Sequence, residues 1–172
     1  MNGSIYEREL AGILSGNPST LEKISKRLDP ISKSILNTLK EKPFYVVRAA
    51  GSLGADIVAV RDDYSLVIEV KSSIHPTIMF TEASGMRQEQ AERLQAKCLK
   101  SGLFLMYAYR LKNTSGDAWR MYSIPGEPSG RLRYLYGILS NVGETKKGNY
   151  NLKWDNGTPL VKFIDYLNQE IK

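Results

Sequence analysis

The spacing of apolar positions divides this chain into helical and strand segments. Near the N-terminus, Ile5, Leu10, Ile13 and Leu14 recur at the spacing of one helical face. Two shorter stripes of the same period follow before Pro43, so three N-terminal helices are expected. Farther along, the pattern predicts strands at about 44–49, 55–61 and 66–71, a helix at about 86–100, and two strands within 103–110 and 118–124.

Capping residues suggest where the N-terminal helices begin. Ser4 followed by Glu7 fits a capping box, in which the glutamate bonds back to the backbone of the N-cap. Ser19 and Glu22 repeat this pattern for the second helix. Asp29, followed by a proline, is typical of an N-cap and first helical position of a third helix.

The second half of the chain is less regular. Residues 72–84 are expected to form a loop, and 131–154 have a mixed pattern. A final helix is expected from Thr158 to about Ile171. We therefore predict a mixed α/β fold, with a core at 1–125, a helical insertion at about 15–42, and a C-terminal extension at 126–172 packed on that core.

Composition adds limits on class and location. The 172 residues are 42% hydrophobic, which suits one domain with a real core. No apolar run approaches the roughly 20 residues that a membrane span needs. The N-terminus lacks the basic segment and apolar stretch of a signal peptide, so a cytoplasmic location is expected.

Charge and metal-ligand types narrow the chemistry. A single cysteine, Cys98, and a single histidine, His75, exclude zinc sites built on several of either residue. A metal would therefore need oxygen ligands, which favours Mg²⁺ or Mn²⁺. The net charge of +6 suits a polyanionic partner such as nucleic acid.

Two acids interrupt strongly apolar strand segments. Asp56 opens the run ADIVAV, and Glu69 lies inside LVIEV, two residues before Lys71. Side chains alternate along a strand, so Glu69 and Lys71 share one face. Because a buried carboxylate needs a partner, these residues are candidates for a hydrolytic metal site. The spacing D-x12-E-x-K is short, however, and solvated charges at strand ends are the structural alternative.

The segment between the first two strands has two further interpretations. Its GSLG sequence, at 51–54, is rich in glycine, as phosphate-binding loops are. It lacks the GK[ST] ending and leads into a strand, so nucleotide binding is not expected. A simple turn is the structural alternative.

Three separate blocks, YEREL, VVRAAGSLGADIVAV and LVIEVKSS, occur here in order. Their content and order resemble the archaeal Holliday junction resolvases of the PD-(D/E)xK nuclease superfamily. The resemblance covers about 5–14 and 44–125. It implies a restriction-endonuclease-like α/β fold, with a mixed five-stranded sheet flanked by helices. The superfamily proline before the first acid is Ala55 here.

The resemblance also assigns roles to individual residues. It implies catalytic roles for five residues: Glu7, Ser52, Asp56, Glu69 and Lys71. Mg²⁺, for which Mn²⁺ can substitute, would be held by Asp56, Glu69, Glu7 and the backbone carbonyl of Val70. Lys71 would position or activate water. Glu9 is the nearest substitute for Glu7, whose structural alternative is the capping box.

Four further residues are candidates for DNA binding: Arg8, Arg48, Arg87 and Gln90. Arg8 follows Glu7, and Arg48 ends the first strand. Arg87 and Gln90 lie on a helix comparable to one that helps to build the family's site and dimer. For the helix residues, a solvated surface is the alternative, and Arg93 and Lys97 are expected to face outward there.

The function implied by the resemblance is metal-dependent resolution of four-way DNA junctions in recombination and repair. A homodimer would supply two matched cuts, and a sliding clamp is a further candidate partner. The alternatives are a related nuclease acting on flaps or replication forks, and a catalytically inactive DNA-binding scaffold. The insertion at 15–42 and the segment 126–172 lie outside the range of this resemblance.

Overall fold

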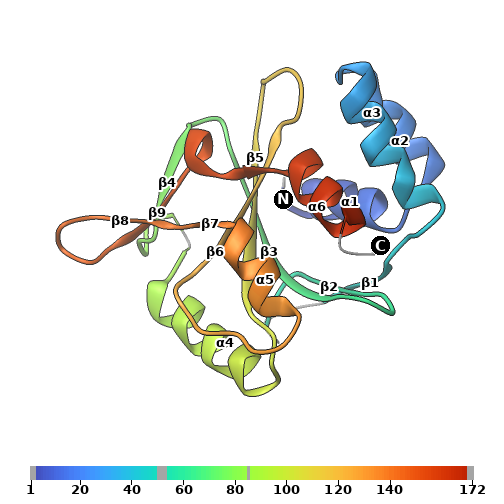
Figure 1. Cartoon of the computed structure of the whole chain (residues 1–172). Coiled ribbons are helices and arrows are strands. Elements are labelled where there is room, and N and C mark those ends of the chain that lie inside the picture. Colours follow the sequence, from blue (N-terminus) through green and yellow to red (C-terminus); the bar gives the residue numbers. More distant parts are fainter. Residues whose placement is uncertain (1–2, 50–53, 85, 170–172) are drawn as a thin grey trace.

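The computed structural model describes residues 3–49, 54–84 and 86–169. In this part of the chain, a mixed β-sheet separates two groups of helices (Figure 1). The α helices are α1 (Gly3–Leu14), α2 (Pro18–Ser25), α3 (Pro30–Asn37), α4 (Gln88–Lys100), α5 (Leu132–Ile138) and α6 (Leu160–Gln169). Single 3₁₀ turns lie at Thr38–Lys40 and Trp154–Asn156.

The strands form one large and one small sheet. They are β1 (Tyr45–Arg48), β2 (Ile57–Val60), β3 (Ser65–Ser73), β4 (Thr77–Met79), β5 (Leu105–Leu111), β6 (Trp119–Ser123), β7 (Ser140–Asn141), β8 (Gly143–Glu144), β9 (Tyr150–Lys153) and β10 (Thr158–Pro159). The large sheet has the order β1-β2-β3-β5-β6-β10, with β7 paired to β6. The small sheet has the order β4-β9-β8.

The large sheet contains the five predicted strands. β1, β2 and β3 are antiparallel, β3 and β5 are parallel, and β6 returns antiparallel to β5. This mixed arrangement with helices on both faces confirms the predicted restriction-endonuclease-like α/β class. Two short strands from the C-terminal segment, β7 and β10, widen the sheet from five strands to seven within the described residues.

Alternation along the strands gives the sheet two buried faces. On one face, Ile57 and Ile68 pack in a cluster with Leu10 of α1 and Phe163 of α6. The other face, which includes Tyr107, packs against α4 through buried residues such as Ala91 and Cys98. Figure 1 shows α1, α2, α3 and α6 on one side of the sheet and α4 on the other. The sheet therefore separates two buried clusters, one on each of its faces.

The N-terminal helices form where expected, but two of their caps differ. α3 is capped by Asp29, whose Oδ1 accepts from the backbone N–H of Ser32 at 3.0 Å, as predicted. α2 is capped by Asn17, so the assignment of Ser19 as N-cap is wrong. The capping box at Ser4 is also wrong, because α1 already includes Gly3. Proline at the first position of α2 explains the earlier start.

Two later expectations also need correction. The expected loop at 72–84 contains β4, which pairs with β9 some 70 residues later in the chain, from Thr77↔Lys153 to Met79↔Asn151. The final helix begins at Leu160, because Thr158 and Pro159 first form β10 against β6. Both errors concern short strands whose partners lie far away in sequence, and such pairing leaves little trace in local periodicity.

Candidate active site

The turn between β2 and β3 brings the two candidate carboxylates side by side. Asp56 immediately precedes β2, where Ile57 is paired with Ile68, so Glu69 lies across the strands from Asp56. The Oδ2 atom of Asp56 accepts a hydrogen bond from the backbone N–H of Val70 at 2.7 Å. This bond fixes the Asp56 carboxylate against β3. The predicted pairing of the two acids is therefore present in the structure.

The electrostatics of this pair are unfavourable for two negative charges. Burial, together with a hydrogen bond and charge repulsion from Asp56, raises the pKa of Glu69 to about 8, while Lys71 opposes the shift. The carboxylate of Glu7 contributes a smaller effect that also raises the Glu69 pKa. Close like charges favour a shared proton or a bound cation between them. This geometry suits a cation.

Lys71 and Tyr107 complete the floor beside Glu69. Lys71 lies two residues after Glu69 in β3, and Tyr107 is the register partner of Glu69 in β5. Burial, followed by the charges of Glu69 and Asp56, raises the pKa of Tyr107. Its hydroxyl therefore stays neutral and keeps a proton to donate. Tyr107 is not among the site residues predicted from the sequence, so its place in the site was missed.

The site opens into a groove between the sheet and α4 with a volume of about 490 Å³. Its floor includes Glu69, Lys71 and Tyr107, and its rim includes Gly54. The opposite wall consists largely of polar side chains from the start and outer face of α4: Arg87, Gln90, Arg93 and Lys97. The structure thus brings Arg87 and Gln90 to the site, and it adds Arg93 and Lys97, which were expected to face outward.

Glu7 lies at the margin of the site and has a partner. Its Oε2 atom accepts from Nη2 of Arg48 at 3.1 Å, with the Glu7 side chain 21% and the Arg48 side chain 36% exposed. Arg48 therefore faces a carboxylate in this structure. Arg8 is exposed on α1. Ser52 lies outside the described residues.

The donor set fits a hard divalent cation. Asp56 and Glu69 provide carboxylate oxygens, and Mg²⁺ is commonly held by one or two carboxylates, with water and phosphate oxygens as its other ligands. Within the described residues, no group of three or more histidine, cysteine or acidic side chains is close enough to hold a metal. The pair would thus act with few other protein ligands, as an open site requires.

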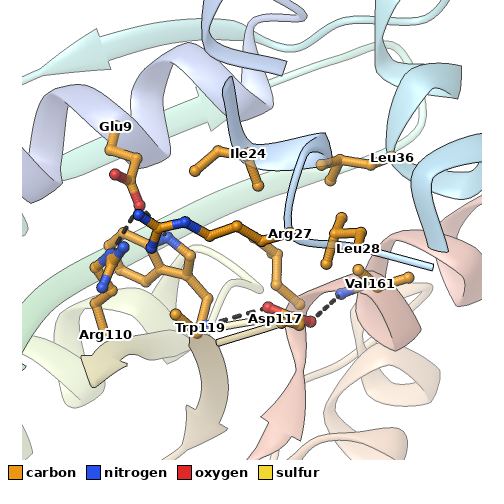
Figure 2. Close-up of a pocket in the computed structure, with 12 residues that line it drawn as sticks. Glu9, Ile24, Arg27, Leu28, Leu36, Arg110, Asp117, Trp119 and Val161 are labelled. Carbon is orange, nitrogen blue, oxygen red and sulfur yellow. Dashed lines mark hydrogen bonds and ion pairs between the residues drawn. The ribbon is translucent and has the colours of Figure 1, made fainter. Parts of the chain in front are cut away.

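A second, smaller cavity lies on the other face of the sheet, between the N-terminal helices and the start of α6 (Figure 2). There the Oε1 atom of Glu9 accepts from Nε of Arg110 and from Nε1 of Trp119, each at 2.9 Å. Asp117 accepts from the backbone N–H groups of Trp119 and Val161. Glu9 is thus engaged away from the Asp56–Glu69 pair, which removes it as a substitute for Glu7.

Comparison with protein families gives a match to the model for the archaeal Holliday junction resolvase (Hjc), over residues 29–171. The chain belongs to this family. It is thereby a nuclease of a family that acts on DNA junctions. The match includes 126–171, so the expectation that the resemblance ends near 125 is wrong. α1, with Glu7 and Arg8, precedes the matched range.

Two other comparisons complete the picture. The chain is similar to a solved structure of Archaeoglobus fulgidus Hjc, a Holliday junction resolvase from an archaeal hyperthermophile. The sequence identity is 18%, the TM-score is 0.49, and the alignment covers 77% of this chain and 95% of that one. No curated protein sequence matches the chain. No helix among the described residues is long and apolar enough to cross a membrane.

Proposed function

We propose that this protein is a Mg²⁺-dependent endodeoxyribonuclease that resolves four-way DNA junctions in recombination and repair. One observation carries the proposal: Asp56 lies beside Glu69, and Glu69 and Lys71 line a groove whose far wall is basic. Family membership supports the junction as substrate. Acting on DNA, the protein would work in the cytoplasm, with a sliding clamp as a candidate recruiting partner.

The residues divide the chemistry among them. Asp56 and Glu69 hold Mg²⁺, for which Mn²⁺ can substitute, assisted by the backbone carbonyl of Val70 and by Glu7, directly or through water. A bound Mg²⁺ supplies positive charge to oxygens on the scissile phosphate and acidifies water. Lys71 orients or deprotonates the attacking water, and in-line attack on phosphorus breaks the P–O3′ bond, which leaves a 5′-phosphate and a 3′-hydroxyl.

The remaining predicted residues serve binding. Arg87 and Gln90, on the groove wall, contact the DNA backbone, and so do Arg8 and Arg48. Ser52 approaches the scissile phosphate from the segment before Asp56. Residues 1–125 carry these groups, and 126–172 act as an extension that supports them. Specificity comes from junction shape and phosphate contacts, so binding weakens steeply with salt.

Paired cuts call for two copies of the site. A four-way junction has two-fold symmetry, which a two-fold homodimer matches. One surface supports such pairing: Tyr45, Val47, Val58 and Val60 are exposed on the β1–β2 hairpin. Val58 and Val60 alternate with buried residues and so share the face of Asp56. Sedimentation of the unaltered protein and of the Val47→Glu variant tests whether this surface forms the dimer. An unaltered protein that binds junction DNA as a monomer would contradict the proposed dimer.

The function is tested by cleavage of three labelled substrates of related sequence: a four-way junction, a flap and a linear duplex. Each is incubated with the protein, with Asp56→Asn and with Glu22→Gln, in Mg²⁺ or EDTA. Glu22→Gln is a matched control, because Glu22 is exposed on α2. We expect symmetric junction cuts in Mg²⁺, lost in Asp56→Asn while binding persists.

The other outcomes point elsewhere. Preferred cleavage of the flap would identify a related nuclease of flaps or forks. Binding without cutting by the unaltered protein would identify an inactive scaffold. The presence of Asp56, Glu69 and Lys71 together counts against the scaffold, because binding alone gives no chemical reason for all three.

A further inference from the structure

The wall of the groove opposite Glu69 is a row of polar side chains at helical spacing. Arg87 is the N-cap of α4, and Gln90, Arg93 and Lys97 follow at intervals of three, three and four residues. This spacing places all four on one helical face. The same face includes Leu94, which also lines the groove. The row extends about 15 Å along the helix.

The direction of α4 sets which part of the row lies near which end of the site. α4 belongs to the crossover from β3 to the parallel strand β5, so it runs opposite to both. Its second half lies beside the segment that leads to Asp56, since a side-chain carbon built on Gly54 would be 3.8 Å from Cδ1 of Leu94. Arg93 and Lys97, which flank Leu94, therefore line the part of the groove near Gly54, two residues before Asp56.

The charges of Arg93 and Lys97 are available to a ligand. Three other arginines of the described chain, Arg48, Arg61 and Arg110, each form an ion pair with a carboxylate. Among the residues that the structure describes, no carboxylate lies within 4.0 Å of the charged groups of Arg93 or Lys97. Both side chains are exposed on the groove. Two unpaired cations lining a groove with a nuclease site suit an anionic chain.

We propose that Arg93 and Lys97 bind consecutive phosphates of the cut DNA strand, on one side of the scissile phosphate. The inference rests on the proposed function and adds two binding residues to it. Along the helix the two positions are about 6 Å apart, so the cations can engage neighbouring phosphates of one strand. Their role is to hold the strand in register with the Asp56–Glu69 pair.

The test is the salt dependence of binding to a labelled four-way junction in EDTA. It compares the unaltered protein, the double variant R93Q/K97Q, and the control K26Q/K33Q. The control removes two exposed positive charges, one at the C-cap of α2 and one on α3, on the opposite side of the sheet, so both variants have the same net charge. Thermal unfolding of each protein checks that the exposed substitutions leave the fold intact.

Each lost phosphate contact should reduce the slope of log Kd against log salt by about 0.9. We therefore expect R93Q/K97Q to lower the slope by about 1.8 and to weaken binding by roughly ten- to thirty-fold near physiological salt. The control variant should keep the slope of the unaltered protein. An R93Q/K97Q slope equal to that of the control overturns the proposal.

A second measurement uses the unaltered protein and altered DNA. Neutral methylphosphonates replace the phosphates one at a time on either side of the mapped cut site. Neutral groups at two adjacent positions on one side should weaken binding by the unaltered protein and by the control, but have little further effect on R93Q/K97Q. Additive losses at every position would contradict the assignment, because coupled partners give non-additive losses.

Different results contradict the nuclease function and the role of Arg93 and Lys97. An unaltered protein that neither binds nor cuts the junction contradicts the proposed function itself. An unaltered protein that cuts the junction, together with an R93Q/K97Q variant of unchanged slope and unchanged methylphosphonate pattern, contradicts only the role of Arg93 and Lys97.

Discussion

Two groups of acidic side chains lie on opposite faces of one sheet and are treated differently by their surroundings. Behind the sheet, Glu9 accepts from Arg110 and Trp119, and Asp117 accepts from two backbone N–H groups (Figure 2). In front of it, Asp56 and Glu69 face each other, and burial together with the hydrogen bond and charge of Asp56 raises the pKa of Glu69 to about 8. The first group is matched to donors, and the second contains like charges.

The difference separates a structural site from a reactive one. A carboxylate matched to a cation and an indole N–H has little remaining capacity for a ligand, and its removal should disturb the fold. Carboxylates that repel each other weaken the fold, yet they form a ready site for a metal ion. The opening toward α4 gives the second group access to a large substrate, which the smaller cavity of the first group lacks.

The largest expected effect concerns Lys71, the cation beside the repelling pair. Lys71→Met removes the group that orients or deprotonates water, so cleavage should slow by about 10²–10⁴-fold. Junction binding in EDTA should change by only a few-fold, because the other cations of the groove remain. Single-turnover cleavage and binding titrations measure the two effects. Equal losses in both would show that Lys71 serves binding alone.

Glu9→Gln, unlike Lys71→Met, should lower the stability of the fold and leave cleavage nearly unchanged. It leaves the buried Arg110 guanidinium without its carboxylate, so the free energy of unfolding should fall by about 2–4 kcal/mol. The cleavage rate per folded molecule should stay within about twofold of the unaltered protein. Denaturant unfolding and single-turnover cleavage provide the measurements, with Glu22→Gln as the surface control. A large loss of cleavage without loss of stability would contradict the structural role.

A smaller effect concerns stability against pH. The folded protein holds a proton on Glu69 up to about pH 8, whereas the unfolded chain releases it near 4.5. The folded state therefore binds more protons between these values, and this group makes the metal-free protein less stable as pH rises through that window. Glu69→Gln should flatten the decline in melting temperature measured in EDTA. An equally steep decline in the variant would exclude Glu69 as its cause.

The smallest expected effect concerns the margin of the site. Arg48→Gln removes the cation that partners Glu7, so the negative charge of Glu7 should act more strongly on Glu69. We expect the pKa of Glu69 to rise further, and the pH midpoint of cleavage to move upward by a few tenths of a unit. A pH profile of single-turnover cleavage measures the shift. A downward shift would contradict the electrostatic link.

The sequence predicts much of the site on the Asp56–Glu69 face of the sheet, but it does not predict the contacts of Glu9 on the other face. The apolar runs around Asp56 and Glu69 predict central strands, and the short DDYS turn at 62–65 fixes their pairing. These signals are local in the sequence, so they can be recognised without a structure. Glu9, by contrast, is bound by Arg110 and Trp119, which lie about 100 residues farther along the chain. No local sequence pattern predicts such long-range contacts.

The α4 wall shows a different limit. The helical period of 86–100 predicts that Ala91 and Cys98 face inward, and both are buried, whereas Arg93 and Lys97, which were expected to face outward, line the groove. A helical pattern separates buried from exposed positions, and an exposed position can still border a groove built by another element. The distinction depends on the tertiary placement of α4 against β3, which long-range packing determines.

The central claim is that the repelling pair, and not the matched one, is the cation site. Calorimetric titration of Mn²⁺ at pH 7, repeated in buffers of different ionisation enthalpy, tests it directly. We predict one ion bound per chain with release of close to one proton, since Glu69 is protonated at that pH. Asp56→Asn and Glu69→Gln should lose this binding, whereas Glu9→Gln should keep it. Unchanged Mn²⁺ binding in Asp56→Asn and Glu69→Gln would contradict the account.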